Sequence, residues 1–471
     1  MGIGPIAGTV SSGAGSPRAS GLHGVLGPRI VIAGTHSGAG KTTVATGLMA
    51  ALRRTGLRVA SAKVGPDFID PGYHALATGR PPRNLDAWIC GEDAVSALAA
   101  RAGAGADILV VEGVMGMFDG AGPGMQASTA AVAATIGAPI VLVVDAAAMS
   151  GSVAAMVHGF NTLHAGISVA GVILNRVGSA GHEELLRAAL EPLGLPVLGA
   201  LHRDDALTWR DRHLGLVPVV EDRPAAARAV ARLADVVAAG IDLGAVVALA
   251  RAAPATAVGE PAPARRVGHA TIAVAAGPAF SFTYPDNLER LEQAGAELVP
   301  FDPAADPGLP AGATGLVVGG GFPEVFAEAL GANRPMLDDV RARIGAGLVT
   351  WAECGGLLWL CRSLDGHPMV GVVPADGTMT DRPTLGYRTA TVVADCPLGA
   401  AGTTLRGHEY HYSTVGPPGD ALDLVGRGGR APAGFSTVTM LASYLHLHLG
   451  ADPAPAERFV RLASSALVAD R

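Results

Sequence analysis

The sequence has few charged residues, few cysteines and no long apolar run. Charged residues make up 16% of the 471 residues and the net charge is −7, which argues against a broad nucleic-acid-binding surface. No apolar stretch reaches the roughly 18–20 residues that span a bilayer, so no membrane segment is predicted. The four cysteines form no Cys-x-x-Cys pair, a pattern typical of free thiols in a cytoplasmic protein. We therefore expect a soluble cytoplasmic protein that binds neither nucleic acid nor membrane.

The distribution of residue types predicts two α/β domains preceded by a tail. Residues 1–28 are rich in Gly, Ser and Ala and are predicted to be a disordered tail. Strands alternate with helices over 29–250, an Ala-Pro-rich linker follows at 251–268, and a second alternation fills 269–471. Near-continuous Val, Ile and Leu runs indicate a parallel sheet covered on both faces in the first domain. Its strands are predicted at 30–33, 59–63, 108–112, 140–145, 169–175 and 197–201.

Residues 29–43, Arg-Ile-Val-Ile-Ala-Gly-Thr-His-Ser-Gly-Ala-Gly-Lys-Thr-Thr, have the pattern of a phosphate-binding loop. An apolar strand runs into a glycine-rich loop, and Gly-Lys-Thr opens a helix. Backbone N–H groups at the helix N-terminus can hold phosphate oxygens, Lys41 can reach the terminal phosphates, and the Thr42 hydroxyl can face Mg²⁺. The sequence therefore predicts binding of ATP or another nucleoside triphosphate. The predicted nucleotide-binding residues are Gly38, Gly40, Lys41, Thr42 and Thr43.

Three carboxylates follow predicted strands beside this loop. Asp67 comes after the strand at 59–63, and Glu112 ends the strand at 108–112, with Asp119 seven residues later. Ligands of parallel sheets bind beyond the C-terminal ends of the strands, where carboxylates can hold Mg²⁺. We expect Asp67 and Glu112 to join Thr42 as metal ligands, and all three acids to serve catalysis. Alternatively, one or two of them cap helices or pair with Lys63 or Arg83.

A second strand-turn-helix pattern contains Cys354. Residues 348–358, Leu-Val-Thr-Trp-Ala-Glu-Cys-Gly-Gly-Leu-Leu, read as a strand followed at once by a cysteine and a helix. At such a bend, backbone N–H groups and the helix N-terminus activate the thiol as a nucleophile. The glycines at 319–321 can supply a second N–H for an oxyanion. Two candidate bases, His446 and His448, stand near the C-terminus in Tyr-Leu-His-Leu-His (444–448).

These motifs resemble those of the cobyrinic acid a,c-diamide synthases. The runs at 63–74, 79–88, 111–120 and 201–221 are similar to the family's signatures, as is the Ala-Glu-Cys-Gly-Gly elbow. The resemblance implies an N-terminal domain like dethiobiotin synthetase and a C-terminal class I glutamine amidotransferase domain. It also implies ATP- and Mg²⁺-dependent amidation of the a- and c-acetate groups of a corrinoid polycarboxylate. Glutamine would provide ammonia at Cys354, and the carboxylates would react as acyl phosphates.

The resemblance also suggests roles for single residues. The family's catalytic histidine follows a Tyr-aliphatic pair, which selects His446. His448 stands where many class I members have an acid. The sequence therefore does not identify the group that orients the ring of His446. By analogy with dethiobiotin synthetase, Asn175 would read the adenine edge; alternatively it is a turn-forming residue. Related nucleotide-binding enzymes often have a second lysine at the position of His36. The sequence therefore does not decide whether a lysine of the second subunit contacts ATP in a possible homodimer.

Several alternatives to one substrate and one function remain at this point. The Ala- and Arg-rich composition favours hydrogenobyrinic acid, the metal-free corrinoid, over cobyrinic acid. Cobyric acid synthase is disfavoured by the run at 63–74. A nucleotide-switch ATPase with a degenerate amidotransferase tail would have a similar phosphate loop. Such an ATPase would not need a cysteine at a strand-to-helix turn together with a histidine near the C-terminus. In addition, His36 replaces the lysine that such switches use.

Overall fold

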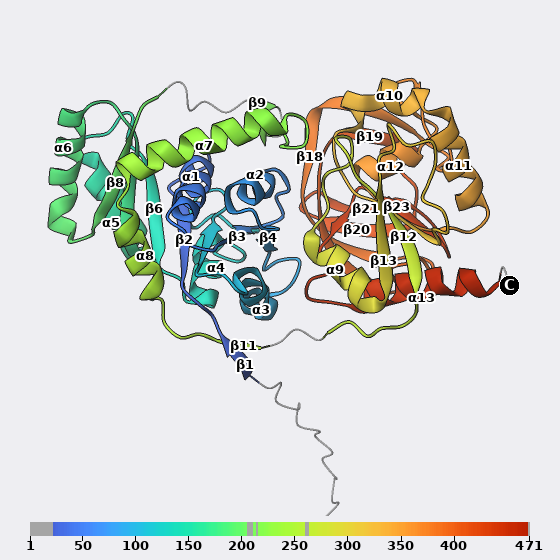
Figure 1. The fold of residues 1–471 in the computed structure, drawn as a ribbon, viewed down its shortest axis with the longest axis horizontal. Coiled ribbons are helices and arrows are strands. Elements are labelled where there is room, and N and C mark those ends of the chain that lie inside the picture. Colours follow the sequence, from blue (N-terminus) through green and yellow to red (C-terminus); the bar gives the residue numbers. More distant parts are fainter. Residues whose placement is uncertain (1–21, 205–210, 213–214, 260–262, 470–471) are drawn as a thin grey trace, which may run out of the picture.

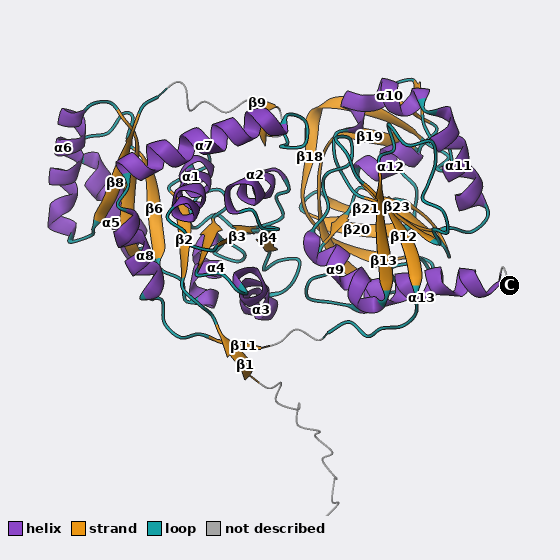
Figure 2. Ribbon diagram, viewed as in Figure 1, coloured by secondary structure: helices purple, strands orange, loops and turns teal. Residues whose placement is uncertain are grey.

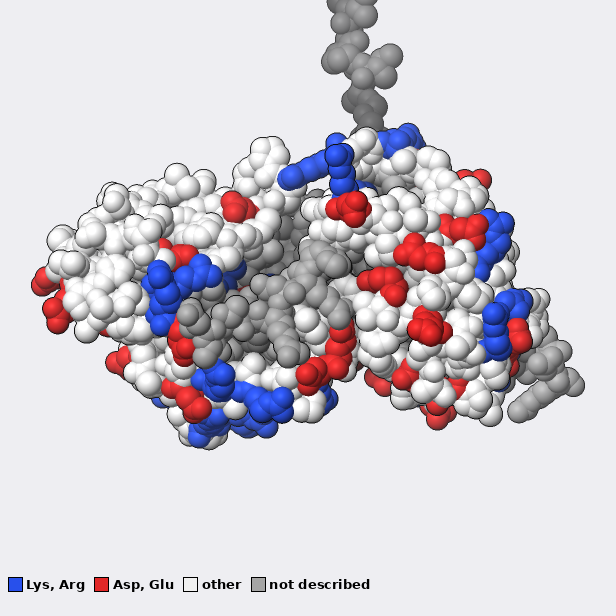
Figure 3. Space-filling model, turned by 90° about the horizontal axis from the view of Figure 1, so that it is seen from above, with Lys and Arg blue, Asp and Glu red and all other residues white. Residues whose placement is uncertain are grey.

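Two lobes lie side by side in the computed structural model, which describes residues 22–204, 211–212, 215–259 and 263–469 (Figure 1). The chain passes from the first lobe to the second along the lower edge of the view, through β11 (Ala257–Gly259). Seen from above, both lobes carry acidic and basic side chains on their surface (Figure 3). Within the described ranges, no helix has the length and hydropathy needed to cross a membrane.

The first lobe is built on a sheet of seven parallel strands. The six predicted strands are present, and the short β4 extends one edge. The strands β2, β3 and β5 are buried along their whole length, which explains why most of their residues are apolar on both faces of the sheet. In order across the sheet, the strands are β4 (Arg83–Leu85), β3 (Val59–Val64), β5 (Ile108–Glu112), β2 (Arg29–Gly34), β6 (Ile140–Asp145), β7 (Val169–Val177) and β8 (Val197–His202).

Helices cover both faces of this sheet, as Figure 2 shows. One core contains Val95 and Leu186, and the other contains Leu48 and Val230. The first face is covered by α3 (Glu92–Gly103), α4 (Thr129–Ile136), α5 (Ser152–Thr162) and α6 (Ala180–Leu190), the last followed by a 3₁₀ turn (Glu191–Leu193). The second face is covered by α1 (Lys41–Arg54), α2 (Ile69–Thr78), α7 (Arg223–Gly240) and α8 (Leu243–Arg251).

The second lobe contains a six-stranded sheet that is parallel except at one edge. Its strands, in order, are β13 (Ala296–Phe301), β12 (Ala270–Ala275), β14 (Gly315–Val318), β15 (Val349–Glu353), β23 (Met440–Ser443) and β22 (Phe435–Thr437). One core includes Leu291 and Phe459, from α9 (Pro285–Ala294) and α13 (Ala454–Ala469). The other core includes residues of α10 (Ala327–Ala332), α11 (Arg334–Gly345) and α12 (Gly355–Leu360); the 3₁₀ turn Pro323–Phe326 precedes α10.

A further sheet of the second lobe has no counterpart in the sequence predictions. Its centre is the long antiparallel pair β18 (Asp376–Val392) and β19 (Thr404–Gly416). The short β24 (His446–Leu447) joins β19 in a register that sets His408 opposite His446. The fold thereby brings β19 beside the predicted catalytic histidine. The remaining strands are β16 (Ser363–Leu364), β17 (His367–Pro368), β20 (Leu422–Gly426) and β21 (Gly429–Ala433).

Short strands lie inside the predicted tail and linker, while the domain boundaries stay a prediction. β1 (Leu22–Val25) pairs antiparallel with β11, so residues 22–25 are ordered and the linker contains regular structure. Residues 1–21 and 260–262 lie outside the described residues. In the 201–221 signature, β9 (Asp211–Arg212) pairs with β10 (Gly215–Leu216), while 205–210 and 213–214 also lie outside them.

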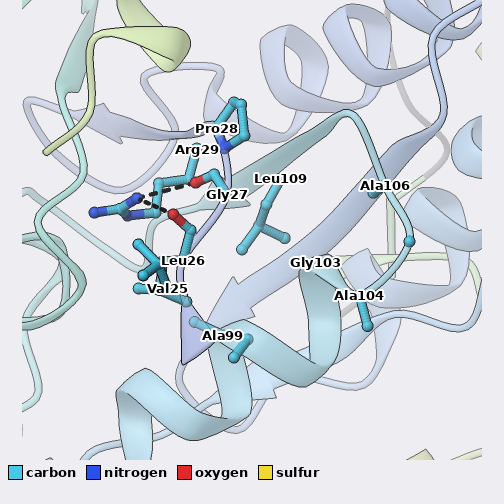
Figure 4. Close-up of a pocket in the computed structure, with 12 residues that line it drawn as sticks. Val25, Leu26, Gly27, Pro28, Arg29, Ala99, Gly103, Ala104, Ala106 and Leu109 are labelled. Carbon is cyan, nitrogen blue, oxygen red and sulfur yellow. Dashed lines mark hydrogen bonds between the residues drawn. The ribbon is translucent and has the colours of Figure 1, made fainter. Parts of the chain in front are cut away.

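Arg29, at the start of β2, ties the interdomain connection to the first sheet. Its buried guanidinium donates to the carbonyls of Leu26 and Gly27 beside a small pocket (Figure 4). It also donates to Pro254 O and Thr256 Oγ1, both at 2.7 Å, on the segment that leaves the first lobe. Because a buried guanidinium needs several acceptors, this set of oxygens explains an arginine inside the core.

Candidate functional site

The phosphate loop connects β2 to α1 and surrounds the side chain of Lys41. Gly38 and Gly40 have φ of 84° and 99°, left-handed values that glycine adopts without strain. Lys41 is buried, and its Nζ donates to the His36 carbonyl at 3.2 Å. Burial and the charge of Lys63 lower the pKa of Lys41 to about 8. The predicted loop geometry is therefore present, with its lysine turned into the loop.

The hydroxyl of Thr42 lies in a buried ionic cluster at the C-terminal ends of β3 and β5. Thr42 Oγ1 donates to Glu112 Oε1 at 2.7 Å and lies 3.3 Å from Asp70 Oδ2. Lys63 Nζ donates to the same two carboxylates, at 2.7 Å each. His74 Nε2 lies 2.6 Å from the other oxygen of Glu112. Both oxygens of this glutamate are therefore engaged.

Neighbouring charges decide which members of the cluster are ionised. Burial raises the pKa of Glu112, but Lys63 and His74 outweigh it, so the pKa is lowered. Burial lowers the pKa of Lys63, but Asp70 and Glu112 outweigh it, so the pKa is raised. Burial and the charge of Asp70 raise the pKa of Asp67 well above its usual range. Glu112 is therefore a carboxylate and Lys63 an ammonium, while burial and Asp70 make Asp67 easier to protonate than a free aspartate.

Asp70 is the acid of this cluster that sequence reasoning missed. It lies in the first turn of α2, three residues after Asp67 in the Asp-Phe-Ile-Asp run. An acid at a helix N-terminus beside the strand end was the available signal. Asp67 lies next to Asp70 rather than Thr42, and its Oδ1 accepts from Ile69 N at 2.8 Å. The role of Asp67 as a metal ligand stays a prediction.

The oxygen atoms around Thr42 form a donor set that suits Mg²⁺. Thr42, Asp70 and Glu112 converge on one place, and hydroxyl and carboxylate oxygens are the ligands that this hard cation prefers. In the described part of the chain, no three His, Cys, Asp or Glu side chains are arranged to hold a metal by themselves. Phosphate oxygens would therefore have to complete the coordination, as in other phosphate-loop sites.

Asp119 and Asn175 contact backbone close to the phosphate loop. Asp119 Oδ2 accepts from Gly116 N at 2.8 Å, and its charge acts on Lys41. Asn175, in β7, donates through Nδ2 to Ala39 O at 3.0 Å. Both contacts shape the loop region, while the catalytic role of Asp119 and the adenine contact of Asn175 stay predictions.

Cys354 stands at the sharp bend between β15 and α12, as predicted. Its φ of 48° is a left-handed backbone value that residues other than glycine rarely adopt. The next residue approaches a second turn: a Cβ on Gly355 would lie 3.1 Å from Gly321 N. Gly320 N already donates to Phe282 O. The N–H groups of Gly321 and Gly355 are thus the pair that can face an oxyanion.

His446 reaches Cys354 from β24. Its side chain hydrogen-bonds that of Cys354, and its Nδ1 lies 3.4 Å from Glu353 Oε2. Burial lowers the pKa of His446, but Cys354 and Glu353 outweigh it and raise the pKa to about 10. The imidazole is therefore protonated at neutral pH and can act as a proton donor.

A pocket opens at Cys354 between the turn after β14 and strand β19. It is lined by Phe322 and Glu324 on one side and by Tyr410 and Tyr412 on the other. Aromatic walls, an acid and a nucleophile can hold a small polar molecule such as an amino acid. The two tyrosines belong to the Gly-His-Glu-Tyr-His-Tyr-Ser run at 407–413.

His448, the other candidate base, faces the first lobe instead. Its Nδ1 lies 3.2 Å from Cys90 Sγ, and its ring lies 4.6 Å from that of Tyr284. It is buried, so it belongs to the contact between the two domains. The sequence pattern alone could not tell this from a catalytic role.

Residues 66–70 of the first lobe connect the two sites. The ring of Phe68 lies 5.0 Å from that of His446 and 4.3 Å from that of Tyr284. Tyr284 Oη donates to Pro66 O at 2.8 Å. Two residues after Phe68, Asp70 contacts Thr42 and Lys63. One five-residue stretch therefore touches both the cysteine site and the phosphate loop.

Comparison with protein families assigns a different domain to each lobe. Residues 30–217 match the "CobQ/CobB/MinD/ParA nucleotide binding domain" and residues 271–454 match the "CobB/CobQ-like glutamine amidotransferase domain". The first lobe is therefore a nucleotide-binding domain and the second a glutamine amidotransferase domain. Among solved structures, that titled "Structure of PurLQS from Thermotoga maritima" has a TM-score of 0.31 at 13% identity over 43% of this chain and 100% of the other, too distant to carry an argument.

Curated relatives match nearly the whole chain. The "Hydrogenobyrinate a,c-diamide synthase" of Streptomyces coelicolor is 48% identical, covering 92% of this chain and 97% of its own. The protein of the same name from Mycobacterium tuberculosis is 47% identical with the same coverage. The "Cobyrinate a,c-diamide synthase" of Syntrophotalea carbinolica is 44% identical, covering 92% of this chain and 98% of its own.

Proposed function

Since this chain belongs to the family of hydrogenobyrinate and cobyrinate a,c-diamide synthases, we propose that it amidates the a- and c-acetate groups of hydrogenobyrinic acid. ATP activates each carboxylate and glutamine supplies the nitrogen. The observation that carries the proposal is the contact of residues 66–70 with both sites, through Phe68 and Asp70. An enzyme that releases ammonia at one site and uses it at another needs the two sites joined in this way.

The first lobe is proposed to convert a carboxylate into an acyl phosphate. A carboxylate is a poor electrophile, so one of its oxygens takes the γ-phosphoryl group of ATP, and ADP leaves. Lys41 and the N-terminus of α1 bind the phosphates. Thr42, Asp70 and Glu112, with Asp67 as a further candidate, would hold Mg²⁺, which neutralises phosphate charge. Ammonia then attacks the acyl carbon, phosphate leaves, and the amide forms.

The second lobe is proposed to release that ammonia from glutamine. The Cys354 sulfur attacks the amide carbon, and the N–H groups of Gly321 and Gly355 hold the resulting oxyanion. His446 gives a proton to the departing nitrogen, which leaves as ammonia. Water then cleaves the thioester to glutamate and restores the thiol. The alternative of a nucleotide-switch ATPase is not favoured, because curated relatives over the full length are named synthases.

The cobalt-free corrinoid is proposed as the substrate. The two relatives described above that are named for hydrogenobyrinate are 47–48% identical to this chain, and the one named for cobyrinate is 44% identical. We expect the purified protein to convert hydrogenobyrinic acid into a diamide faster than cobyrinic acid, in a reaction that needs ATP, Mg²⁺ and glutamine. Mass spectrometry of the two reactions, run side by side, measures this. A faster reaction with cobyrinic acid would reverse the substrate assignment, and no diamide from either would contradict the function.

A further inference from the structure

The structure contains an acid that can take the position left open beside His446. We propose that Glu353, the residue that precedes the nucleophile, orients the His446 imidazole and stabilises its protonated form. This inference rests on the proposed glutaminase role of Cys354 and His446. Glu353 is then a positioning residue, since it acts through His446.

The carboxylate of Glu353 contacts both the ring and the strand of His446. Its Oε2 lies 3.4 Å from His446 Nδ1, and its Oε1 accepts from Leu447 N at 2.9 Å. The first distance is long for a hydrogen bond, but such contacts often tighten only when substrate binds. In the described part of the chain, His446 Nδ1 makes no hydrogen bond of good geometry, so no other acceptor competes for it.

The other nearby acids are neutralised by arginines. Glu409 on β19 accepts from Arg388 Nε at 2.7 Å, and Asp286 accepts from Arg83 Nη1 at 2.8 Å. No lysine or arginine of the described residues forms an ion pair with Glu353, whose ion-pair partner is His446. Its negative charge is therefore available to the imidazolium.

The other titratable groups around His446 offer it little support. From β19, His408 has its pKa lowered by burial and by His446, and burial lowers the pKa of His411 to about 4. Both are therefore neutral near pH 7. The groups that face His446 are Glu353 at the end of β15, Cys354 at the bend that follows, and His408, Glu409 and His411 from β19. Glu353 is thus the acid whose charge can offset the lowering of the His446 pKa by burial.

Replacement of Glu353 by Gln tests this role. The amide keeps the size of the side chain and an acceptor for Leu447 N, but it loses the charge. We expect kcat for glutamine hydrolysis to fall about 10²-fold with KM little changed. The basic limb of the pH–rate profile should move down by about one unit or more, because loss of the carboxylate lowers the pKa of His446. Glu353→Asp should recover part of kcat, and synthesis from added ammonia should stay at the wild-type rate.

Glu409→Gln is the matched control, because it removes the charge of a second glutamate near the same imidazole. Since Arg388 already neutralises that charge, we expect a smaller shift of the basic limb. An unshifted profile with normal kcat in Glu353→Gln, or an equal shift in Glu409→Gln, would overturn the role of Glu353. Glutaminase activity retained in Cys354→Ala would instead overturn the proposed function itself, so the two failures are distinguishable.

Discussion

Replacement of Cys354 by Ala is expected to abolish amide synthesis with glutamine and to leave synthesis from added ammonia intact. The sulfur is the proposed nucleophile, and loss of such a group lowers kcat by about 10⁴-fold or more. Carboxylate activation is proposed for the first lobe, which has cores and a phosphate loop of its own. The measurement is steady-state formation of the amide, with either glutamine or saturating ammonium as the nitrogen source.

Three further variants, of one cysteine and two histidines, make this result specific. Cys361→Ala removes another buried thiol and should keep both activities. Burial raises the pKa of the Cys361 thiol to about 12. His446→Ala should behave like Cys354→Ala, whereas His448→Ala should lose less, because His448 contacts Cys90 rather than Cys354. Loss of both activities in folded Cys354→Ala would show that the proposed division of labour is wrong. Equal losses at the two histidines would leave the base unassigned.

Glu112→Gln is expected to lose amide synthesis with either nitrogen source while glutamine hydrolysis survives in part. The charge of Glu112 holds Thr42, Lys63 and His74 in one arrangement, and an amide replaces one acceptor oxygen by a donor. We expect a loss of about 10²-fold or more, roughly 3 kcal/mol of transition-state stabilisation. The measurement is synthesis with saturating ammonium at increasing Mg²⁺, for the wild type and the variant.

Glu183→Gln, on the outer helix α6, is the matched control for this change. Glu183 pairs with Arg187 and His202, away from the phosphate loop, and its variant should keep the wild-type rate. Surviving glutaminase activity would show that Glu112→Gln still folds, since breaking a buried ion pair can itself destabilise a protein. A near-normal rate and Mg²⁺ dependence in Glu112→Gln would leave Glu112 a structural role.

The first sheet, the phosphate loop and the cysteine elbow could be predicted because each is a local pattern. Fully buried parallel strands give continuous apolar runs, and a strand, a glycine turn and a helix follow one another directly at Lys41 and at Cys354. The β18–β19 pair gives no such run. Its first strand contains Pro383 and Gly386, residues that weaken strand predictions, and buried and exposed residues mix along it.

The residues that complete the sites could not be predicted, because their contacts join elements far apart in the sequence. Asp70 meets Thr42 only when α2 packs beside α1. Glu353 meets His446 only because β24 lies beside the end of β15. Phe68 touches His446 only across the contact between the lobes. Local patterns specify each half of the enzyme, and the tertiary fold specifies how the halves meet.

The most direct test follows the nitrogen from glutamine into the product. The wild-type protein would be given ATP, Mg²⁺, hydrogenobyrinic acid and glutamine labelled with ¹⁵N at its amide, with unlabelled ammonium present. If ammonia passes from Cys354 to the phosphate loop inside the molecule, mass spectrometry should find a diamide that carries ¹⁵N at both new amides. A diamide whose added nitrogens come from the unlabelled ammonium, or no diamide at all, would contradict the account.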